Sequence, residues 1–124
     1  MLPLGMTINM DGTAIMQVVA TLFIAGCGGF DVSAFQLVII MVLALIASMG
    51  TPAAPGAGAV ILFTILSGVC FTNESALIAY SLILAINRPI EMLVTSLNCV
   101  GDSVAAITVA KSEGKLNEEV YNRK

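Results

Sequence analysis

The sequence predicts an all-α integral membrane protein, made of a broken transmembrane helix, a re-entrant helical hairpin and a final transmembrane helix that carries a polar stripe. Two observations predict this class. Apolar residues make up 58% of the 124 positions and charged residues 10%, whereas soluble globular chains are about 45–50% apolar and about 25% charged. Breaker segments, two of them rich in Gly or Pro and one polar, divide the apolar sequence into four stretches.

The charges exclude a nucleic-acid partner and favour the lipid bilayer instead. The formal net charge is −3, and four of the five basic residues lie between residue 111 and residue 124. The rest of the chain therefore has no basic surface for phosphates. The cysteines, Cys27, Cys70 and Cys99, show no metal-ligand spacing, and we interpret them as small apolar residues.

Residues 1–30 are predicted to form the second half of a broken transmembrane helix. The segment Asn9-Met-Asp-Gly-Thr13 places a carboxylate and a glycine directly before an apolar stretch. In a membrane chain, such a break exposes backbone carbonyls and polar side chains to a cation. The alternative is an ordinary helix start that is capped by Asp11 or Thr13. No signal peptide precedes this segment, so we expect the chain to begin inside a longer protein.

Residues 31–75 are predicted to form a re-entrant helical hairpin with a Gly- and Pro-containing tip at residues 50–58. Its two apolar stretches, residues 35–49 and 59–71, have 15 and 13 residues. At 1.5 Å per residue they would reach about 23 Å and about 20 Å, less than a hydrocarbon core of about 30 Å. The non-helical tip would then be buried in protein or line a polar cavity. The alternative is two short spans that are joined by a loop.

Residues 76–110 are predicted to form the last transmembrane helix, and its polar residues fall on one stripe. A carboxylate at the centre of a bilayer costs about 2.5–3.5 kcal/mol. Two carboxylates on one stripe therefore predict a cation, a ligand ammonium or a polar cavity beside them. An ion pair between Glu91 and Arg88 is the alternative for the first of the two. The stripe is spaced for one face of an α-helix and consists of Asn87, Glu91, Thr95, Asn98 and Asp102.

Residues 111–124 are predicted to form a polar tail in the cytoplasm. The tail holds four basic residues, whereas the connections at residues 28–34 and 72–75 hold none. This asymmetry predicts a multi-pass protein of the cell membrane, plasma or inner, with a cytoplasmic C-terminus and a hairpin that opens outward. The segment Asn73-Glu-Ser75 fits a glycosylation sequon on the outer side.

Three ordered segments resemble the dicarboxylate/amino acid:cation symporter family, which includes glutamate, aspartate and neutral amino-acid transporters. Pro3-Leu-Gly-Met-Thr-Ile-Asn-Met-Asp-Gly-Thr13 is similar to its unwound seventh transmembrane segment. Ser48-Met-Gly-Thr-Pro-Ala-Ala-Pro-Gly-Ala-Gly58 is similar to the tip of its second re-entrant hairpin, and Asn98-Cys-Val-Gly-Asp102 to the polar end of its eighth segment. The resemblance covers nearly the whole chain and implies the C-terminal part of a transport domain.

The resemblance implies sodium ions as cofactors at three sites, which are built from oxygen atoms. Hard cations prefer such ligands, and unwound backbone supplies neutral ones. The implied ligands are Asp102, Asn9, Gly5 and Asn98 at the first site; Thr7, Ser48, Met49 and Thr51 at the second; and Asp11 with Asn9 at the third.

The resemblance also implies a substrate site for an amino acid or dicarboxylate. Glu91 stands where the family has an Asp for the substrate ammonium. Val94 stands where members with acidic substrates have an Arg, and Val cannot replace a bidentate Arg–carboxylate pair. We therefore expect a neutral amino acid, with an acidic amino acid or dicarboxylate as the alternative. The implied substrate residues are Thr13, Ala54, Glu91, Thr95 and Asn98.

These observations predict part of a secondary active transporter that carries out sodium-coupled symport of an amino acid. The resemblance implies an elevator-type movement and a homotrimer in the full-length protein. The chain has no His, and its Ser, Cys and Thr residues have no evident base, so an enzyme is not expected. Three alternatives stay open: proton coupling through Glu91 beside Arg88, a channel-like pore subunit, and an inactive fragment.

Overall fold

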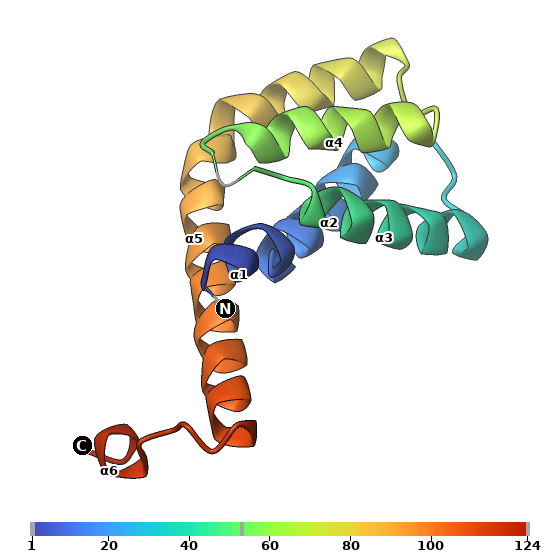
Figure 1. Cartoon of the computed structure of the whole chain (residues 1–124). Coiled ribbons are helices and arrows are strands. Elements are labelled where there is room, and N and C mark those ends of the chain that lie inside the picture. The colour runs from blue at the N-terminus through green and yellow to red at the C-terminus, as the bar shows by residue number, and fades with distance from the viewer. Residues whose placement is uncertain (1, 53, 124) are drawn as a thin grey trace.

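The computed structural model describes residues 2–52 and 54–123, and it is all-helical there, with no β-strand in those ranges (Figure 1). This confirms the all-α prediction. Residue 53, in the predicted hairpin tip, lies outside the described residues. The helices are α1 (Leu2–Ile8), α2 (Asp11–Gly28), α3 (Ala34–Met49), α4 (Ala57–Gly68), α5 (Glu74–Ser112) and α6 (Glu118–Tyr121).

The chain leaves helical geometry for two residues between α1 and α2. The backbone of Met10 has φ −111° and ψ 52°, which is outside the helical region. No side chain caps the start of α2, so neither Asp11 nor Thr13 acts as the cap that the alternative interpretation required. Two helical segments therefore meet at a short non-helical junction.

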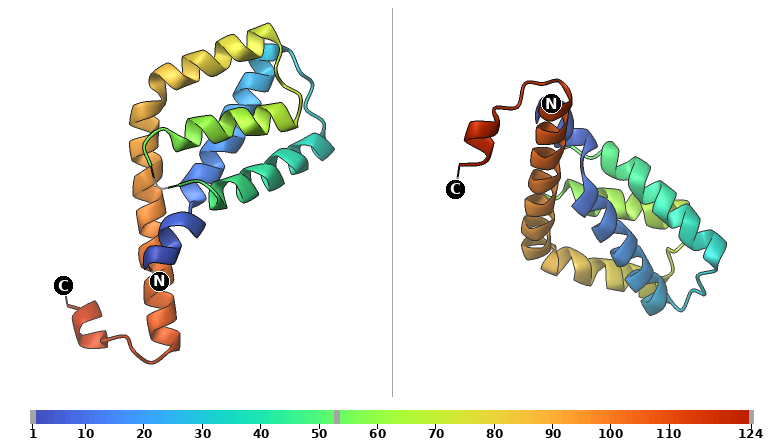
Figure 2. Two further views of the ribbon diagram at one scale, coloured as in Figure 1. Left: turned by 45° about the horizontal axis from the view of Figure 1, so that its top comes forward. Right: turned by 90° about the horizontal axis from the view of Figure 1, so that it is seen from below.

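Helices α3 and α4 form a helical hairpin whose tip points toward α5 (Figures 1 and 2). Ser33 and Gln36 form a capping box at the start of α3, which satisfies two backbone groups that the helix leaves free. Gly56 precedes α4 with φ 85°, a left-handed conformation that glycine adopts without strain. Both helices pack against α2 as well as against each other.

Helix α5 has 39 residues and contains Pro89. Its ribbon bends sharply in the yellow-to-orange part, so that one limb lies across the top of the bundle and the other descends (Figure 1). Proline lacks an N–H and its ring clashes with the carbonyl four residues before it, which explains a bend here. At the start of α5, Asn73 accepts a hydrogen bond from Ala76 N and donates one to Gly28 O, both 2.8 Å long.

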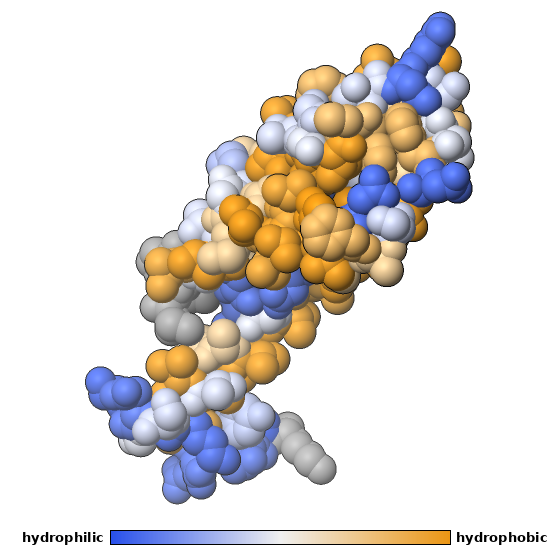
Figure 3. Space-filling view, turned by 90° about the vertical axis from the view of Figure 1, so that its right-hand side faces the viewer, coloured by the Kyte–Doolittle hydropathy of each residue, from blue (hydrophilic) through white to orange (hydrophobic). Residues whose placement is uncertain are grey.

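A small apolar core lies between α2, α3, α4 and α5, and much apolar surface stays exposed. Ile24, Ile40, Leu62 and Leu66 are fully or almost fully buried. In contrast, large apolar side chains cover the outer faces of the helices, and they form the broad hydrophobic band in Figure 3. Exposed surface of this extent marks contact with lipid or with other protein. By length and composition, α2 and α5 qualify to cross a membrane, whereas α3 and α4 are shorter.

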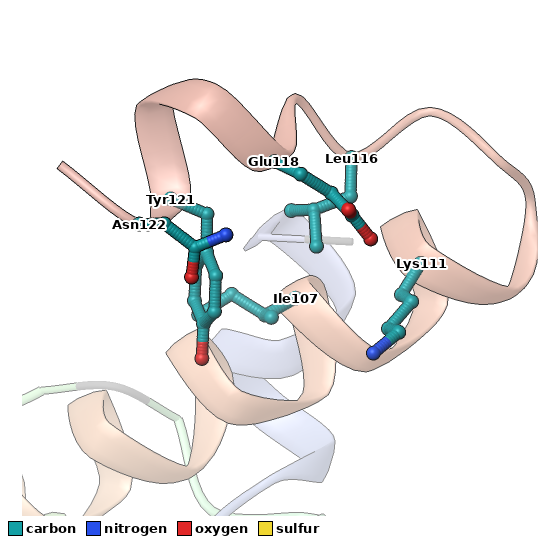
Figure 4. Close-up of a pocket in the computed structure, with 6 residues that line it drawn as sticks. All are labelled: Ile107, Lys111, Leu116, Glu118, Tyr121 and Asn122. Atoms are coloured by element: carbon teal, nitrogen blue, oxygen red, sulfur yellow. The ribbon is translucent and has the colours of Figure 1, made fainter.

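The tail after α5 turns back and ends in the short helix α6, which Asn117 caps through Val120 N. A cavity of about 150 Å³ lies between α6 and the end of α5 (Figure 4). It is lined by Ile107, Lys111, Leu116, Glu118, Tyr121 and Asn122.

Candidate functional site

The junction between α1 and α2 lies against the descending limb of α5. Asn9 Nδ2 donates a hydrogen bond of 3.2 Å to Asp102 Oδ1. On α1, Gly5 lies so close to the Asp102 carboxylate that a Cβ at residue 5 would collide with it. Three of the four residues predicted for the first sodium site therefore lie together.

Gly101 allows two side chains of the site, one of them not yet placed, to approach α5. A Cβ at this position would lie 2.6 Å from Asn9 Nδ2 and 3.0 Å from Asp11 Oδ2. Asp11 thus approaches α5 at the residue next to Asp102. Within the described residues, neither carboxylate forms a salt bridge. The sequence offered no prediction for Gly101, although a single glycine inside a helical pattern has a packing or functional reason in many proteins.

The side chain of Asn98, on α5, forms two hydrogen bonds to the start of α2. Its Oδ1 accepts a hydrogen bond of 2.9 Å from Gly12 N, and its Nδ2 donates one of 3.1 Å to Thr13 Oγ1. Gly12 lies against the α5 backbone, because a Cβ there would lie 2.8 Å from Val94 O. The structure therefore brings together Thr13 and Asn98, two of the predicted substrate residues.

Glu91 and Thr95 form their hydrogen bonds within α5. Asn87 Nδ2 donates to Glu91 Oε1 at 2.7 Å, and Arg88 forms an ion pair of 3.5 Å with Glu91 Oε2. Thr95 Oγ1 donates to the Glu91 backbone carbonyl at 2.8 Å. From the sequence, an ion pair with Arg88 was the alternative to a ligand role for Glu91, and this ion pair is present. The Arg88 side chain is 69% exposed.

The residues predicted for the second sodium site lie on α1 and at the end of α3, which contact each other. Ser48 and Thr51 are buried, and their hydroxyls donate to the carbonyls of Leu45 and Ala47 at 2.8 Å. Each hydroxyl donates its only hydrogen, and its oxygen keeps lone pairs that are free to accept. Ala54, on the tip, is exposed, and its N–H donates to Pro52 O. Thr7, on α1, is exposed as well.

Comparison with known proteins decides the family. A family model described as the sodium:dicarboxylate symporter family matches residues 1–112. The chain belongs to this family. The match confirms the resemblance found in the sequence, and it ends at the last residue of α5.

Individual relatives in the family match most of this chain. It is 34% identical over 118 residues to the proton/sodium-glutamate symport protein of Bacillus caldotenax, which covers 95% of the chain and 27% of that protein. It is 40% identical over 105 residues to excitatory amino acid transporter 2 of Homo sapiens, and 38% over 119 residues to excitatory amino acid transporter 3 of Mus musculus. These alignments cover 85% and 96% of the chain, but only 18% and 22% of those proteins.

For a member of the sodium:dicarboxylate symporter family, the ligand atoms gathered here suit a hard monovalent cation. Asn9, Asp11 and Asp102 offer amide and carboxylate oxygens, and such oxygen ligands are those that hard cations prefer. The described residues hold no cluster of three or more His, Cys, Asp or Glu side chains that would suit a transition metal. The family and the names of its relatives describe transport proteins rather than enzymes.

Proposed function

We propose that the chain forms part of a secondary active transporter that couples the entry of Na⁺ to the import of an amino acid. The observation that carries the proposal is the convergence of Asn9, Asp11 and Asp102 around Gly101. Two carboxylates meet there without a basic partner in the described residues. In a membrane each would cost about 2.5–3.5 kcal/mol, and a bound cation offsets that cost.

The coupling follows from the same charges. With Na⁺ bound and the α3–α4 hairpin closed, the acidic groups are neutralised, and the loaded unit crosses the bilayer at low cost. When a site is empty, Asp11 or Asp102 stays charged, and crossing becomes costly. Coupling is therefore a difference in free energy between loaded and partly loaded states. We propose an elevator-type movement in a homotrimer of the full-length protein, with the tail in the cytoplasm and the protein in the cell membrane.

The hairpin end supplies the second group of proposed ligands. The backbone carbonyls of Thr7, Ser48, Met49 and Thr51 would hold a second Na⁺, since α1 contacts α3. Closure of the tip over this ion would link ion binding to the enclosure of the substrate. The proposed third site, Asp11 with Asn9, needs further ligands from outside this chain.

For the substrate we propose a neutral amino acid, held by Thr13, the tip backbone near Ala54, and three residues of α5: Glu91, Thr95 and Asn98. Glu91 would accept the substrate ammonium. The support is Val94, which offers no hydrogen-bond donor to a side-chain carboxylate. The second candidate is an acidic amino acid, which is favoured by the names of the relatives that transport glutamate.

Competition uptake distinguishes the two substrates. In proteoliposomes that contain the full-length protein, unlabelled serine or alanine should block the uptake of labelled serine, and glutamate at the same concentration should not. The reason is that an unpaired carboxylate beside Val94 would lose its hydration without gaining a charged partner. Preferential block by glutamate would show that the acidic substrate is correct.

Replacement of Asp102 tests the ion site. Asp102→Asn keeps the size of the side chain but removes its charge, so Na⁺-driven accumulation in proteoliposomes should fall by at least about a hundredfold, because two tenfold factors correspond to about 2.8 kcal/mol. The matched control is Asp31→Asn, which removes an exposed acid before α3 and should leave uptake unchanged.

Two outcomes would contradict this assignment. One is wild-type accumulation by Asp102→Asn. The other is wild-type uptake that is equal in sodium and in choline but follows an imposed pH gradient, which would show proton coupling. The name of the Bacillus caldotenax relative includes both the proton and sodium. Uptake is therefore measured both with sodium replaced by choline and with an imposed pH gradient.

A further inference from the structure

Three buried side chains of the described residues carry polar atoms without a hydrogen-bond partner: Gln17, Thr21 and Asn87. Leaving such atoms unpaired costs free energy, and folded proteins do so rarely. The side chains of Gln17 and Thr21 form no hydrogen bond to the candidate site in the part of the chain that the structure describes. Asn87 differs, because its Nδ2 donates a hydrogen bond of 2.7 Å to Glu91 Oε1, and Glu91 is a residue of the proposed substrate site.

The two ends of the Asn87 amide are used differently. Asn87 is 4% exposed. Its Nδ2 makes a short hydrogen bond of the kind that charged acceptors form, whereas its Oδ1 has no partner in the described residues. For folding alone, an apolar side chain of similar size would suit this position, because it would bury no unpaired acceptor. The amide therefore has a cost in stability, as groups of functional sites have in many proteins.

Two donors hold the Glu91 carboxylate. Arg88 Nη1 lies 3.5 Å from Oε2, on an exposed side chain, and Asn87 Nδ2 lies 2.7 Å from Oε1, on a buried residue. Burial removes rotamer freedom from a side chain, so Asn87 is the donor with the more fixed position. The Glu91 side chain is itself 19% exposed, so it stays accessible to a ligand, unlike Asn87.

The Asn87 amide is also neutral. It can fix the carboxylate without cancelling its charge, whereas a cation such as Arg88 competes with a second cation for that charge. Glu91 has a long, flexible side chain, and a group that is held in place before binding loses less entropy when the ligand arrives. We propose that Asn87 is a positioning residue for the substrate, whose amide fixes the Glu91 carboxylate where it accepts the substrate ammonium. This inference rests on the proposed function and adds a residue to that same site.

Uptake by the full-length protein in proteoliposomes tests this role. Asn87→Leu keeps the approximate volume and removes both ends of the amide. The concentration of labelled amino acid for half-maximal uptake, with serine or glutamate as the competition assay selects, should rise by at least about tenfold, since a hydrogen bond to a charged group is worth at least this factor. The maximal rate should stay unchanged, because the loss is in binding. Tm in detergent should not fall, because the unpaired acceptor is lost together with the amide.

Asn87→Ala separates affinity from stability. It removes the same amide but leaves a space in the packing, so it should raise the half-maximal concentration by the same factor as Asn87→Leu while it lowers Tm. Ser81→Ala is the matched control on the same helix, because its exposed hydroxyl donates to Leu77 O. Its half-maximal concentration and its Tm should both match the wild type.

Four results would overturn the inference. One is a wild-type half-maximal concentration in Asn87→Leu, and another is a maximal rate that falls while the half-maximal concentration stays unchanged. The third is a half-maximal concentration that follows Tm across the Leu and Ala variants, which would mean that Asn87 acts through stability alone. The fourth is a larger rise in Arg88→Gln than in Asn87→Leu, which would make Arg88 the group that positions Glu91. Wild-type protein without Na⁺-driven uptake would instead contradict the proposed function, and the substrate role of Glu91 would fall with it.

Discussion

At the scale of single residues, the site depends as much on glycines, which have no side chain, as on polar residues. Gly5 and Gly101 both allow groups of the candidate ion site to approach helix backbone. Asn98 then uses both ends of its amide to join Gly12 and Thr13 to α5. The carboxylates therefore owe their positions to glycines that have no ligand chemistry of their own.

Gly101→Ala should weaken ion binding. The added Cβ would lie 2.6 Å from Asn9 Nδ2 and 3.0 Å from Asp11 Oδ2, so both side chains must move. Overpacking of this kind costs about 1–3 kcal/mol, and a cost of this size in the ion-bound state corresponds to about 5–150-fold in affinity. The Na⁺ concentration for half-maximal uptake by the full-length protein should rise accordingly.

Gly26→Ala is the control for this substitution. Gly26 also lies inside a helix, but no described atom lies within 4 Å of the Cβ it would gain. Its Na⁺ dependence should match the wild type, and alanine should stabilise α2 slightly. A wild-type Na⁺ dependence in Gly101→Ala would argue against a site around residue 101.

At the scale of secondary-structure elements, α5 connects the two ends of the bundle. Its first limb is fixed to α2 by Asn73, whose side chain makes hydrogen bonds to Ala76 N and to Gly28 O. Its second limb, beyond the bend at Pro89, carries Asn98 and Asp102. The side chain of the predicted glycosylation sequon is thus engaged in two structural hydrogen bonds.

Asn73→Ala should destabilise the full-length protein. It removes an N-cap, which is worth about 0.5–2 kcal/mol, together with the link between α2 and α5. We expect Tm to fall by about 2–4 °C in thermal unfolding. Asn117→Ala removes the cap of α6 in the exposed tail and should leave Tm unchanged; an equal loss in both variants would mean that the link to Gly28 contributes nothing.

At the scale of the whole molecule, the chain corresponds to a small share of the relatives that it matches. It spans 18% to 27% of the lengths of the three relatives that are compared above. Its outer faces carry many exposed large apolar side chains, and lipid or the remainder of a full-length transporter would cover such faces.

Deletion of residues 113–124 should leave the transport function intact. These residues lie outside the family match, which ends at residue 112, and α6 lies beside the end of α5 across an open cavity. We expect unchanged Na⁺-driven uptake and a change in Tm below about 1 °C, since surface changes away from packed features cost within about 0.5 kcal/mol. A loss of uptake with normal expression would assign the tail a role in transport.

The sequence by itself determined the helical class, the separation of the chain into apolar stretches, the polar stripe from Asn87 to Asp102 and the family. These are local properties, because helical periodicity places residues three and four apart on one face whatever lies opposite. The ion pair between Arg88 and Glu91 follows from the same spacing.

Only the tertiary structure decided which face of α2 is buried and that Asn9 and Asp11 pack against Gly101. It also decided that the polar atoms of Gln17 and Thr21 are buried without a hydrogen-bond partner in the described residues. The physical reason is that a helix has the same periodicity whichever side is covered. Burial and close approach are set by residues almost a hundred positions away in the chain, as with Asn9 and Asp102, and no local pattern encodes that distance.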